Sequence, residues 1–578
     1  MTIDPGSASA YPARPESVET SLPHPPARAQ RLAELERRTP DVLVIGGGIT
    51  GAGLALDLAA RGLRTALVER DDWAAATSSA SSRLIHGGLR YLEQFEFGLV
   101  RDSCLERGLL LANAAGLVWP ETFVFPVHRG GPVGRLKLAA GLGLYTLVSL
   151  PRALGLPRMH SARAVARRVP GIRASGLVGG GSYLDGATHD ARLTLAVVLS
   201  ALARGALALS RVEAIALENG ANGARVRLRD RISGEERELT PRAVILAGGP
   251  RTDALRALAG LSTGWIRPTR GTHVLVPRER LPTDGAVIFP SPVDGRVMFL
   301  IPWPRYTVIG TTDLDATSDA PVRATRAEVR YLLDSANGLV PAADLGEDDV
   351  VATWAGLRPL LADGADSPSA RSREERIERD GAVYTIAGGK LTGFRSMAER
   401  LGARVAHDLG LGDARRHSPT RGLRLRGAFE RPVARPAWSA LDEHGRARLP
   451  KEATEPAWSR RYAALAPAVG EFCQRVEQGR APLDAETLLG EVDWAVRHED
   501  CLAARDFFLR RTDLGYGPRT TLDAVRERVL ARLAGALGWS STKLAAERED
   551  LARALDAQHA WRAEAPRAAA PPPALKPL

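Results

Sequence analysis

The chain has 578 residues, which at the usual ~100–200 residues per domain corresponds to two to four domains and a large core. Lys and Arg number 78 against 67 Asp and Glu, a formal net charge of +11. This excess is typical of contact with anionic lipid, a phosphorylated substrate or nucleic acid, or simply of an arginine-rich genome. The three cysteines form no CxxC pair, which argues against a disulfide framework or a zinc site and fits a reducing cytoplasm.

The N-terminal stretch, residues 1–38, is rich in Pro, Ala, Ser and Arg and lacks an apolar periodic pattern. We therefore predict a disordered leader. No apolar run has the length of a signal peptide, and none reaches the ~18–20 residues needed to span a bilayer. We expect the protein to stay on the cytoplasmic side of the membrane.

Residues 41–69 have the pattern of a nucleotide-binding unit. A short apolar strand ends in a glycine turn that opens a helix, and a second strand, Thr65–Val68, ends on Glu69. The glycines of the GxGxxG turn are Gly46, Gly48 and Gly51. They allow a tight turn and a close approach to a pyrophosphate at the helix N-terminus, while the carboxylate accepts from a ribose hydroxyl. The pattern predicts a dinucleotide, either FAD or NAD.

The next motif, Thr77–Glu93, reads TSSASSRLIHGGLRYLE. Small hydroxyl residues suit a chain that wraps closely around a phosphate or ribityl group, because they donate hydrogen bonds without bulk. The residues assigned to the cofactor here are Thr77, Ser78, Ser79, Ser82, His86, Gly87 and Gly88. A polar loop with a helix cap would explain Ser78 or Ser79 alone, but not the two cations, Arg83 and Arg90, that flank the glycines.

The segments IGGGITGAG, ALVERDD and TSSASSRLIHGGLRYLE together resemble the FAD-dependent, membrane-associated glycerol-3-phosphate dehydrogenases. The resemblance implies a non-covalent FAD with its adenosine ribose at Glu69, its pyrophosphate over Gly46–Gly51 and its flavin near Ser82–Gly88. It also implies peripheral binding to the inner face of the cytoplasmic membrane, where electrons pass to a quinone. Val212, on a returning strand, is expected to present its backbone to adenine. The family's ATGPW motif is altered here, with Gly248 and Arg251 in place of Thr and Trp.

The apolar segment Leu138–Leu150 is too short to span a bilayer. It lies among basic residues, which favours a helix that rests in the membrane interface, and a buried helix of the substrate domain is the alternative. The surrounding cations are Arg135, Lys137, Arg152, Arg158 and Arg163.

The substrate residues are assigned from the resemblance and from charge. His273 lies on a strand in the family's GTH motif, and a turn at Thr311–Asp313 is expected to anchor a loop near the flavin. Binding of a small phosphorylated alcohol must come mainly from its dianion, which guanidinium and ammonium groups match. The residues assigned to substrate binding are Arg90, Tyr91, Arg358, Arg373 and Lys390, with Arg371 as a register alternative to Arg373.

The glycine turn at Gly388–Thr392 opens a helix whose N–H groups are expected at the pyrimidine end of the flavin. Its assigned cofactor residues are Gly389, Leu391 and Thr392. The family's following Thr-Tyr is replaced by Gly393-Phe394, so one hydroxyl is missing.

Oxidation of a secondary alcohol requires a base for the hydroxyl proton while hydride leaves C2 for the flavin. His273 is the preferred base, because imidazole accepts a proton near neutral pH. Arg358 is better suited to binding and to stabilising alkoxide character, and Lys390 is a base only if its pKa is strongly lowered. The implied reaction converts sn-glycerol 3-phosphate to dihydroxyacetone phosphate.

The predicted fold is a Rossmann-like FAD-binding domain of the amino-acid-oxidase type over residues 39–415, interleaved with a mostly β substrate domain at roughly 90–180 and 260–350. A linker, 416–454, leads to an α-helical C-terminal domain, 455–560, and a disordered tail, 561–578. No metal is expected: His498 and Glu499 form no HExxH motif.

The expected partners are glycerol 3-phosphate, a membrane quinone and an anionic membrane surface, with no nucleic acid and with a homodimer as one option. An oxidase that uses oxygen remains an alternative. So does a basic, catalytically idle flavin-containing binding protein.

Overall fold

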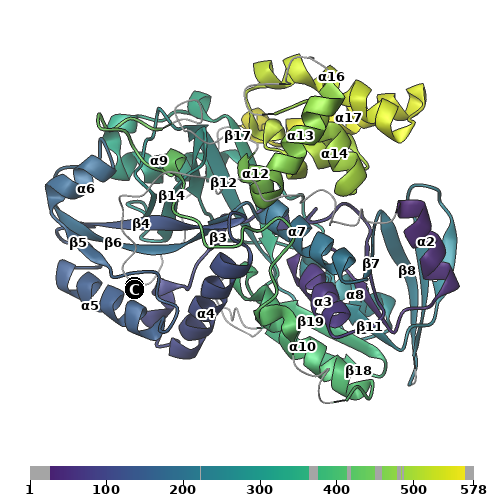
Figure 1. The fold of residues 1–578 in the computed structure, drawn as a ribbon. Coiled ribbons are helices and arrows are strands. Elements are labelled where there is room, and N and C mark those ends of the chain that lie inside the picture. The colour runs from purple at the N-terminus through teal and green to yellow at the C-terminus, as the bar shows by residue number, and fades with distance from the viewer. Residues whose placement is uncertain are drawn as a thin grey trace.

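The structure, a computed structural model, describes residues 27–221, 223–362, 375–412, 418–448, 459–477, 483 and 487–565, with only the backbone of Arg90, Trp438, Ser459 and Glu477. In these residues a six-stranded, a three-stranded and a ten-stranded sheet are followed by a group of helices (Figure 1). The predicted α/β architecture with a helical C-terminal part is therefore confirmed.

The six-stranded sheet contains the predicted nucleotide-binding unit. Its order is β18-β19-β11-β1-β2-β7, in which β1 runs parallel to β2 and β11, and β18 is an antiparallel edge. The strands are β1 (Val42–Ile45), β2 (Thr65–Glu69), β7 (Leu207–Ser210), β11 (Ala243–Leu246), β18 (Glu375–Asp380) and β19 (Val383–Gly388). Val42 and Val44 pack among helices on one face, whereas Leu43 and Ile45 pack against the three-stranded sheet on the other. Burial on both faces explains the continuous apolar run of β1.

Helices cover one face of this sheet and a small sheet covers the other. The helices are α3 (Ile49–Ala60), α7 (Asp190–Ala203) and α10 (Phe394–Asp408). The opposite face carries β8 (Val212–Asn219), β9 (Ala224–Asp230), β10 (Glu236–Leu239) and α8 (Thr252–Leu258). The carboxyl ends of β1 and β2 therefore open toward the start of α3, where the cofactor site is expected.

The ten-stranded sheet contains the strands of the predicted substrate domain. Its main path is β16-β12-β15-β14-β13-β4-β6-β3, with β17 paired to β12 and β5 to β6. The strands are β3 (Leu84–Ile85), β4 (Val118–His128), β5 (Arg158–His160), β6 (Leu177–Thr188), β12 (Thr269–Pro277), β13 (Ala286–Pro290), β14 (Val297–Pro302), β15 (Tyr306–Gly310), β16 (Leu314–Asp315) and β17 (Ala352–Arg358). The two strands that precede the Thr311–Asp313 turn, β14 and β15, form an antiparallel pair. Register places His273 of β12 between Gly310 and Trp354.

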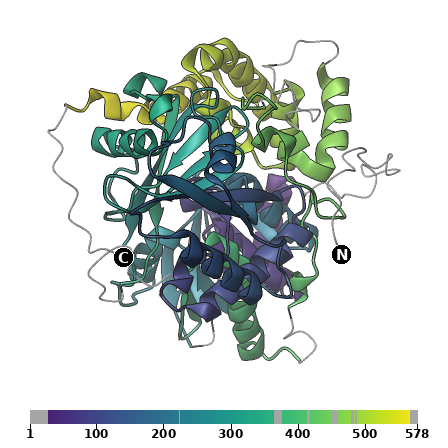
Figure 2. The same cartoon turned by 90° about the vertical axis from the view of Figure 1, so that its left-hand side faces the viewer.

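Helices also flank the ten-stranded sheet. They are α4 (Phe97–Asn113), α5 (Arg135–Val148), α6 (Ala162–Arg168) and α9 (Arg326–Leu339). In Figure 2, α4 and α5 (dark blue) lie on the outside of the molecule, below β4 and β6. The α5 helix packs inward through Leu138, Leu142 and Tyr145, so its inner face is that of a buried helix of the substrate domain.

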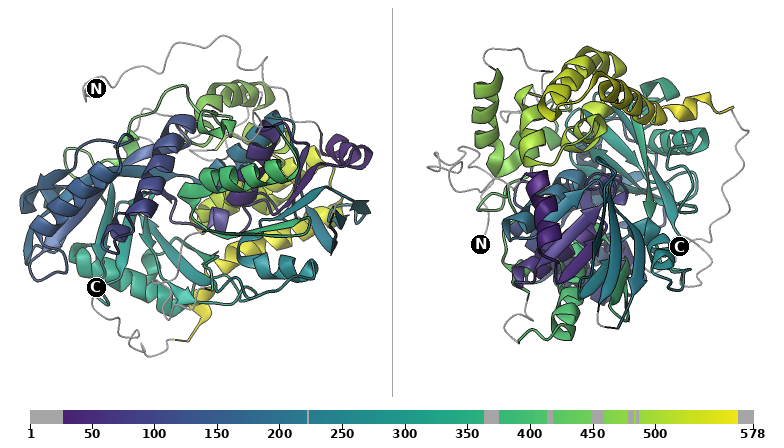
Figure 3. Two further views of the ribbon diagram at one scale, coloured as in Figure 1. Left: turned by 90° about the horizontal axis from the view of Figure 1, so that it is seen from below. Right: turned by 90° about the vertical axis from the view of Figure 1, so that its right-hand side faces the viewer.

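The C-terminal domain packs over both of the other parts (Figures 1 and 3). Its helices are α12 (Ser459–Tyr462), α13 (Ala466–Glu477), α14 (Gly490–His498), α15 (Ala504–Asp506), a turn of π-helix (Phe507–Arg511), α16 (Arg519–Leu537) and α17 (Ser541–Ala557). Buried ion pairs join it to the nucleotide-binding part. Asp72 accepts from Arg510 Nε at 2.5 Å and Arg511 Nη1 at 2.7 Å, and Arg192 pairs with Glu499 at 2.8 Å.

The predicted leader is wrong at its C-terminal end. Residues Arg28–Arg37 form the helix α2. Arg28 pairs with Asp230 at 2.9 Å, and Arg31 donates to Asp500 and, at 2.8 Å, to the Ala208 carbonyl. These partners lie far along the chain, so local composition does not reveal them. Residues 1–26 lie outside the described residues.

The predicted linker and tail are packed where the structure describes them. Phe429 N donates to Ala115 O at 2.9 Å, Arg435 pairs with Asp284 at 2.8 Å, and Arg426 N donates to Ser200 Oγ at 2.8 Å, so residues 418–448 lie against both the predicted substrate domain and the nucleotide-binding part. This stretch contains only short turns of helix, at Pro419–Arg421 and Ala437–Ser439. Trp561, the first residue of the predicted tail, is fully buried beneath α9. The start that we predict for the tail is therefore wrong at this residue.

Replacement of Asp72 by Asn tests the domain junction. The substitution keeps the shape of the side chain but leaves two buried guanidinium groups without their shared carboxylate, so we expect a loss of ~3–5 kcal/mol in the free energy of unfolding. Urea unfolding followed by tryptophan fluorescence measures it. Glu549→Gln, at an exposed pair with Arg553, is the control and should change little. Equal stability of the two variants would contradict the assignment.

Candidate active site

A cavity of about 840 Å³ lies where the three parts of the fold meet. Its volume is in the range of small-molecule and cofactor pockets, roughly 300–1,000 Å³. The segments that line it are the glycine turn after β1, the end of β2, residues 75–82, the start of β8, residues 247–251, parts of β12 and β17, residues 386–392 and, from the C-terminal domain, Leu509, Arg510, Tyr516 and Gln558.

The glycine turn leaves no room for side chains. Gly46 has φ +119°, and a Cβ there would lie 2.4 Å from the Ala247 carbonyl oxygen. A Cβ on Gly51 would lie 1.8 Å from the Gly46 carbonyl oxygen, and one on Gly48 would approach Ser78 Oγ at 3.1 Å. The turn therefore brings bare backbone and the N-terminus of α3 to the cavity wall. This arrangement fits a pyrophosphate, which needs N–H donors and a favourable helix dipole.

The predicted ribose and adenine positions lie beside this turn. Glu69 ends β2 and accepts from Gly47 N at 2.6 Å and Asp71 N at 2.7 Å. Burial raises the pKa of this carboxyl, while the two backbone N–H donors act in the opposite direction. Val212, the first residue of β8, also lines the cavity. The arrangement fits the adenosine end of a dinucleotide.

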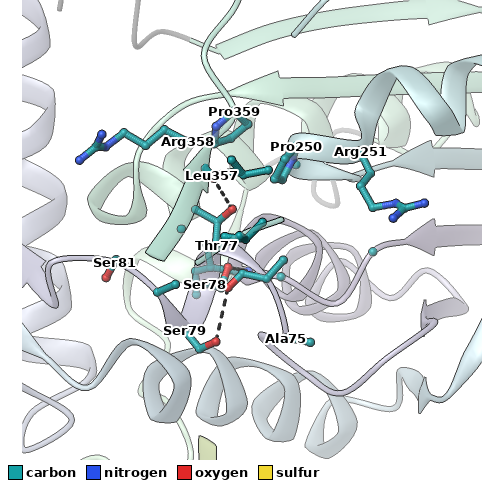
Figure 4. A pocket seen from close by; sticks show the side chains of 18 of the residues that line it. Ala75, Thr77, Ser78, Ser79, Ser81, Pro250, Arg251, Leu357, Arg358 and Pro359 are labelled. Atoms are coloured by element: carbon teal, nitrogen blue, oxygen red, sulfur yellow. Dashed lines mark hydrogen bonds between the residues drawn. The ribbon is translucent and has the colours of Figure 1, made fainter. Parts of the chain in front are cut away.

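Most of the hydroxyl-rich segment faces the cavity. Thr77 Oγ1 donates to the Leu357 carbonyl at 2.6 Å, which ties this segment to the end of β17 (Figure 4). Ser78 Oγ accepts from Ile49 N at 2.9 Å, so it caps the start of α3. The lining residues assigned from sequence are Thr77, Ser78, Ser79, Ser82 and His86. Gly87 and Gly88 lie behind this wall instead. Gly87 N donates to Tyr145 Oη at 3.1 Å.

His273 is buried, with 2% of its surface exposed, and it lines the cavity. Its Nε2 lies 2.9 Å from Ser82 Oγ, and its ring stacks on Trp354 with centroids 5.2 Å apart. Burial, with the neighbouring cations Arg358 and Arg83, lowers the pKa of His273 to about 3. The imidazole is therefore neutral and able to accept a proton.

Arg358 reaches the cavity from the end of β17. Its guanidinium donates to Asp313 Oδ1 at 2.7 Å, the Thr312 carbonyl at 3.1 Å and Thr311 Oγ1 at 3.1 Å. The turn that sequence places near the flavin is thus the turn that orients this arginine. Figure 4 shows Arg358 and Arg251 pointing to opposite sides of the cavity.

Lys390 lines the same cavity with its neighbours Gly389, Leu391 and Thr392. Its ammonium lies 3.9 Å from the centroid of the Tyr91 ring, a cation–π contact that brings the two predicted substrate residues together. Arg90 lies on the same turn of 3₁₀-helix as Tyr91, Leu89–Leu92, with its side chain outside the described residues. Arg371 and Arg373 also lie outside them.

Sequence reasoning missed the contributions of Trp354, Asp513 and Tyr516. Trp354 stacks on His273, and Tyr516 reaches the cavity from a part of the chain ~240 residues away, which no local signal connects to it. Among the described residues no group of three or more His, Cys, Asp or Glu side chains is placed to hold a metal ion.

Comparisons with known proteins identify the family. The model of the FAD dependent oxidoreductase family matches residues 41–399, and that of the C-terminal domain of alpha-glycerophosphate oxidase matches residues 418–544. The aerobic glycerol-3-phosphate dehydrogenase of Staphylococcus saprophyticus is 32% identical over 546 residues, which cover 92% of this chain and 96% of the relative. The chain belongs to the family of FAD-dependent aerobic glycerol-3-phosphate dehydrogenases. FAD is therefore the cofactor, and the NAD alternative is wrong.

Solved structures agree with this family. The glycerol-3-phosphate dehydrogenase from Bacillus halodurans, complexed with FAD, has 28% identity and a TM-score of 0.74, with 93% of this chain and 98% of that chain covered. L-alpha-glycerophosphate oxidase from Mycoplasma pneumoniae, with FAD bound, has 18% identity and a TM-score of 0.51 over 64% of this chain and 95% of that chain, so it shares the fold.

Replacement of Gly51 by Ala tests the glycine turn as part of the FAD site. Because the added methyl group overlaps the Gly46 carbonyl, the turn must shift at a cost of ~1–3 kcal/mol, which corresponds to roughly 10–100-fold weaker FAD binding. Fluorescence titration of the apoprotein with FAD measures it. Gly535→Ala, on a face of α16 with open space around it, is the matched control and should bind FAD normally. Unchanged affinity in Gly51→Ala would contradict the assignment.

Proposed function

We propose that the protein oxidises sn-glycerol 3-phosphate to dihydroxyacetone phosphate, with FAD as its electron acceptor. The observation that carries the proposal is the convergence of a neutral histidine, an arginine and a lysine on one FAD-sized cavity: His273, Arg358 and Lys390 all line it. The names of the relatives, aerobic glycerol-3-phosphate dehydrogenases, support the same substrate.

The cations bind the substrate. A three-carbon phosphorylated alcohol has little apolar surface, so most of its binding energy must come from its charge. Arg358 is held by Asp313, the Thr312 carbonyl and the Thr311 hydroxyl and offers a planar set of N–H donors, while Lys390 adds a compact charge. Tyr91 holds the Lys390 ammonium against its ring face, and Arg90 and Arg373 are assigned to the same task from sequence.

His273 removes the hydroxyl proton. Burial and the neighbouring cations Arg358 and Arg83 lower the pKa of His273, and a bound phosphate dianion offsets the field of these cations, so the proton affinity of the imidazole rises when substrate binds. The Ser82 hydroxyl, 2.9 Å from Nε2, orients the ring, and we assign proton acceptance to that nitrogen. Bound FAD supplies the acceptor for the hydride that leaves C2.

Two variants separate these roles. His273→Asn keeps a polar side chain but removes the base, so kcat should fall by roughly 10²–10⁴-fold with bound FAD retained. Lys390→Met keeps the length of the side chain but removes a charge that binds the phosphate, so KM for sn-glycerol 3-phosphate should rise more than kcat falls. Steady-state assays with a dye acceptor measure both. A His273→Asn variant with parental kcat would rule out this base.

Electrons are then passed to a membrane quinone at an anionic membrane surface. The outward face of α5 supports this step: Leu136 is 88% exposed and Leu147 64% exposed, beside Arg135 and Lys137. An apolar stripe with basic flanks is typical of a helix that rests in a membrane interface. No described helix is both long and apolar enough to cross a bilayer. Assembly as a homodimer stays a prediction.

Replacement of Leu136 by Asp tests the membrane surface. Burial of a leucine side chain contributes ~1.5–3 kcal/mol, so binding to vesicles that contain phosphatidylglycerol should weaken by about tenfold or more. Co-sedimentation measures it. Ile232→Asp, on the turn between β9 and β10 and 58% exposed, makes the same change of charge elsewhere. Equal losses in both variants would point to charge alone and contradict a docking role for α5.

Oxygen is the alternative acceptor, because the family model that matches residues 418–544 describes an oxidase domain. The yield of hydrogen peroxide separates the two. About one peroxide per substrate oxidised, undiminished by added quinone, would support the oxidase.

A further inference from the structure

A buried stack connects the C-terminal domain to His273. The Arg83 guanidinium carbon lies 4.3 Å from the centroid of Trp303 and 4.7 Å from that of Trp354, and Trp354 stacks on the His273 ring. Tyr516 closes the stack edge-on against Trp354, with centroids 5.5 Å apart. Trp354 is also held by its own N–H, which donates to the Ser81 carbonyl at 3.2 Å. The indole ring of Trp354 therefore separates the Arg83 guanidinium from the His273 imidazole.

Asp513 holds this cation in place. Its Oδ1 accepts from Arg83 Nη1 at 3.5 Å and lies 3.0 Å from His189 Nε2, while its Oδ2 accepts from Trp303 Nε1 at 3.2 Å. The His189 Nδ1 accepts from Arg192 N, so its Nε2 carries the proton that it donates to the carboxylate. One carboxylate of the C-terminal domain thus fixes both the arginine and an indole ring that covers it.

We propose that Asp513 is a positioning residue for His273 and that it acts through Arg83 and Trp354. Through this residue the C-terminal domain contributes to the rate of substrate oxidation. The proposal rests on the proposed function of His273 as the base. In the described part of the chain the Asp513 carboxylate forms its hydrogen bonds with Arg83, His189 and Trp303, so its effect on His273 must pass through the stack.

The charges around His273 decide the sign of the effect. Burial lowers the pKa of His273, and the positive charges of Arg358 and Arg83 lower it further. Asp190 and Asp513 lie at 3.9 Å and 3.5 Å from Arg83, and Asp313 pairs with Arg358, so these carboxylates reduce the field of the two cations. Burial raises the pKa of Tyr516 to about 12, which keeps its phenol neutral. Loss of Asp513 should weaken the base, and loss of Arg83 should strengthen it.

The test uses the FAD-loaded full chain and its limiting rate of flavin reduction by sn-glycerol 3-phosphate, measured anaerobically across pH. Arg83→Met keeps the bulk of the side chain without its charge. It should move the acidic limb of the profile to higher pH by roughly one unit. Asp513→Asn should move that limb to lower pH and reduce the plateau rate about tenfold, because a weaker base accepts the proton more slowly. In the double variant that combines Arg83→Met with Asp513→Asn, the acidic limb should lie at the same pH as in Arg83→Met alone.

Glu499→Gln is the matched control, because it removes a buried carboxylate from the same domain junction without touching the stack. It should lower the thermal stability and leave the limb in place. If both Asp513→Asn and Glu499→Gln lower the rate of flavin reduction but neither moves the acidic limb of its pH profile, Asp513 has only a structural role. An unmoved limb in Arg83→Met would overturn the proposal even if Asp513→Asn does not fold. Absence of flavin reduction in the parent would instead contradict the proposed function.

Discussion

Buried arginines, each paired with a carboxylate from a distant part of the chain, hold the three parts of this protein around one cavity. Arg511 and Arg510 share Asp72, and Arg83 meets Asp513, whereas the partly exposed Arg358 is held by Asp313 within the ten-stranded-sheet part. A buried charge without a partner is costly, so these pairs fix how the domains dock. Because each pair lies beside or within the cavity wall, the docking of the domains also sets the positions of the groups that bind and react.

The same pairs change how the charge of the chain is understood. A net charge of +11 suggests a strongly basic surface, yet several arginines lie almost fully inside the fold. The most deeply buried are Arg31, Arg107, Arg256, Arg278 and Arg511. Arg107, for example, donates to Asp185 at 2.9 Å beneath the glycines of the HGG segment. Buried Asp and Glu side chains balance these arginines, so the core does not account for the net positive charge, and the basic flanks of α5 place part of the excess at one surface.

Sequence predicts the parts of the fold that depend on local pattern. The spacing of the glycines predicts the strand, turn and helix at 41–60, because a side chain at any of these glycines would crowd or overlap atoms of the turn or of its neighbours. The arrangement of His273 beside Arg358 was reached through family resemblance, and register between β12 and β17 places both on one sheet. Apolar pattern alone left two options for α5, and the structure accommodates both: one face is buried in the substrate domain and the other is exposed.

Contacts between segments that lie far apart in the chain could not be predicted from the sequence. The helix α2 has no apolar pattern strong enough to predict it, and Arg28 and Arg31 hold it through residues 230 and 500. Asp513 and Tyr516 follow the π-helical turn Phe507–Arg511, yet nothing in that stretch of sequence indicates that Tyr516 packs on Trp354 or that Asp513 holds Arg83. Gly87 and Gly88 were assigned to the cofactor because glycines admit a flat ring, whereas packing of Tyr145 against Gly87 places them behind the wall.

The central claim is that this cavity binds FAD and oxidises a phosphorylated alcohol held by its cations. Anaerobic titration of the FAD-loaded protein with sn-glycerol 3-phosphate, beside unphosphorylated glycerol, tests it most directly. We expect bleaching of the visible flavin absorbance by about one equivalent of the phosphate ester and no bleaching by glycerol at the same concentration. An unchanged spectrum with bound FAD, or equal bleaching by both alcohols, would contradict it.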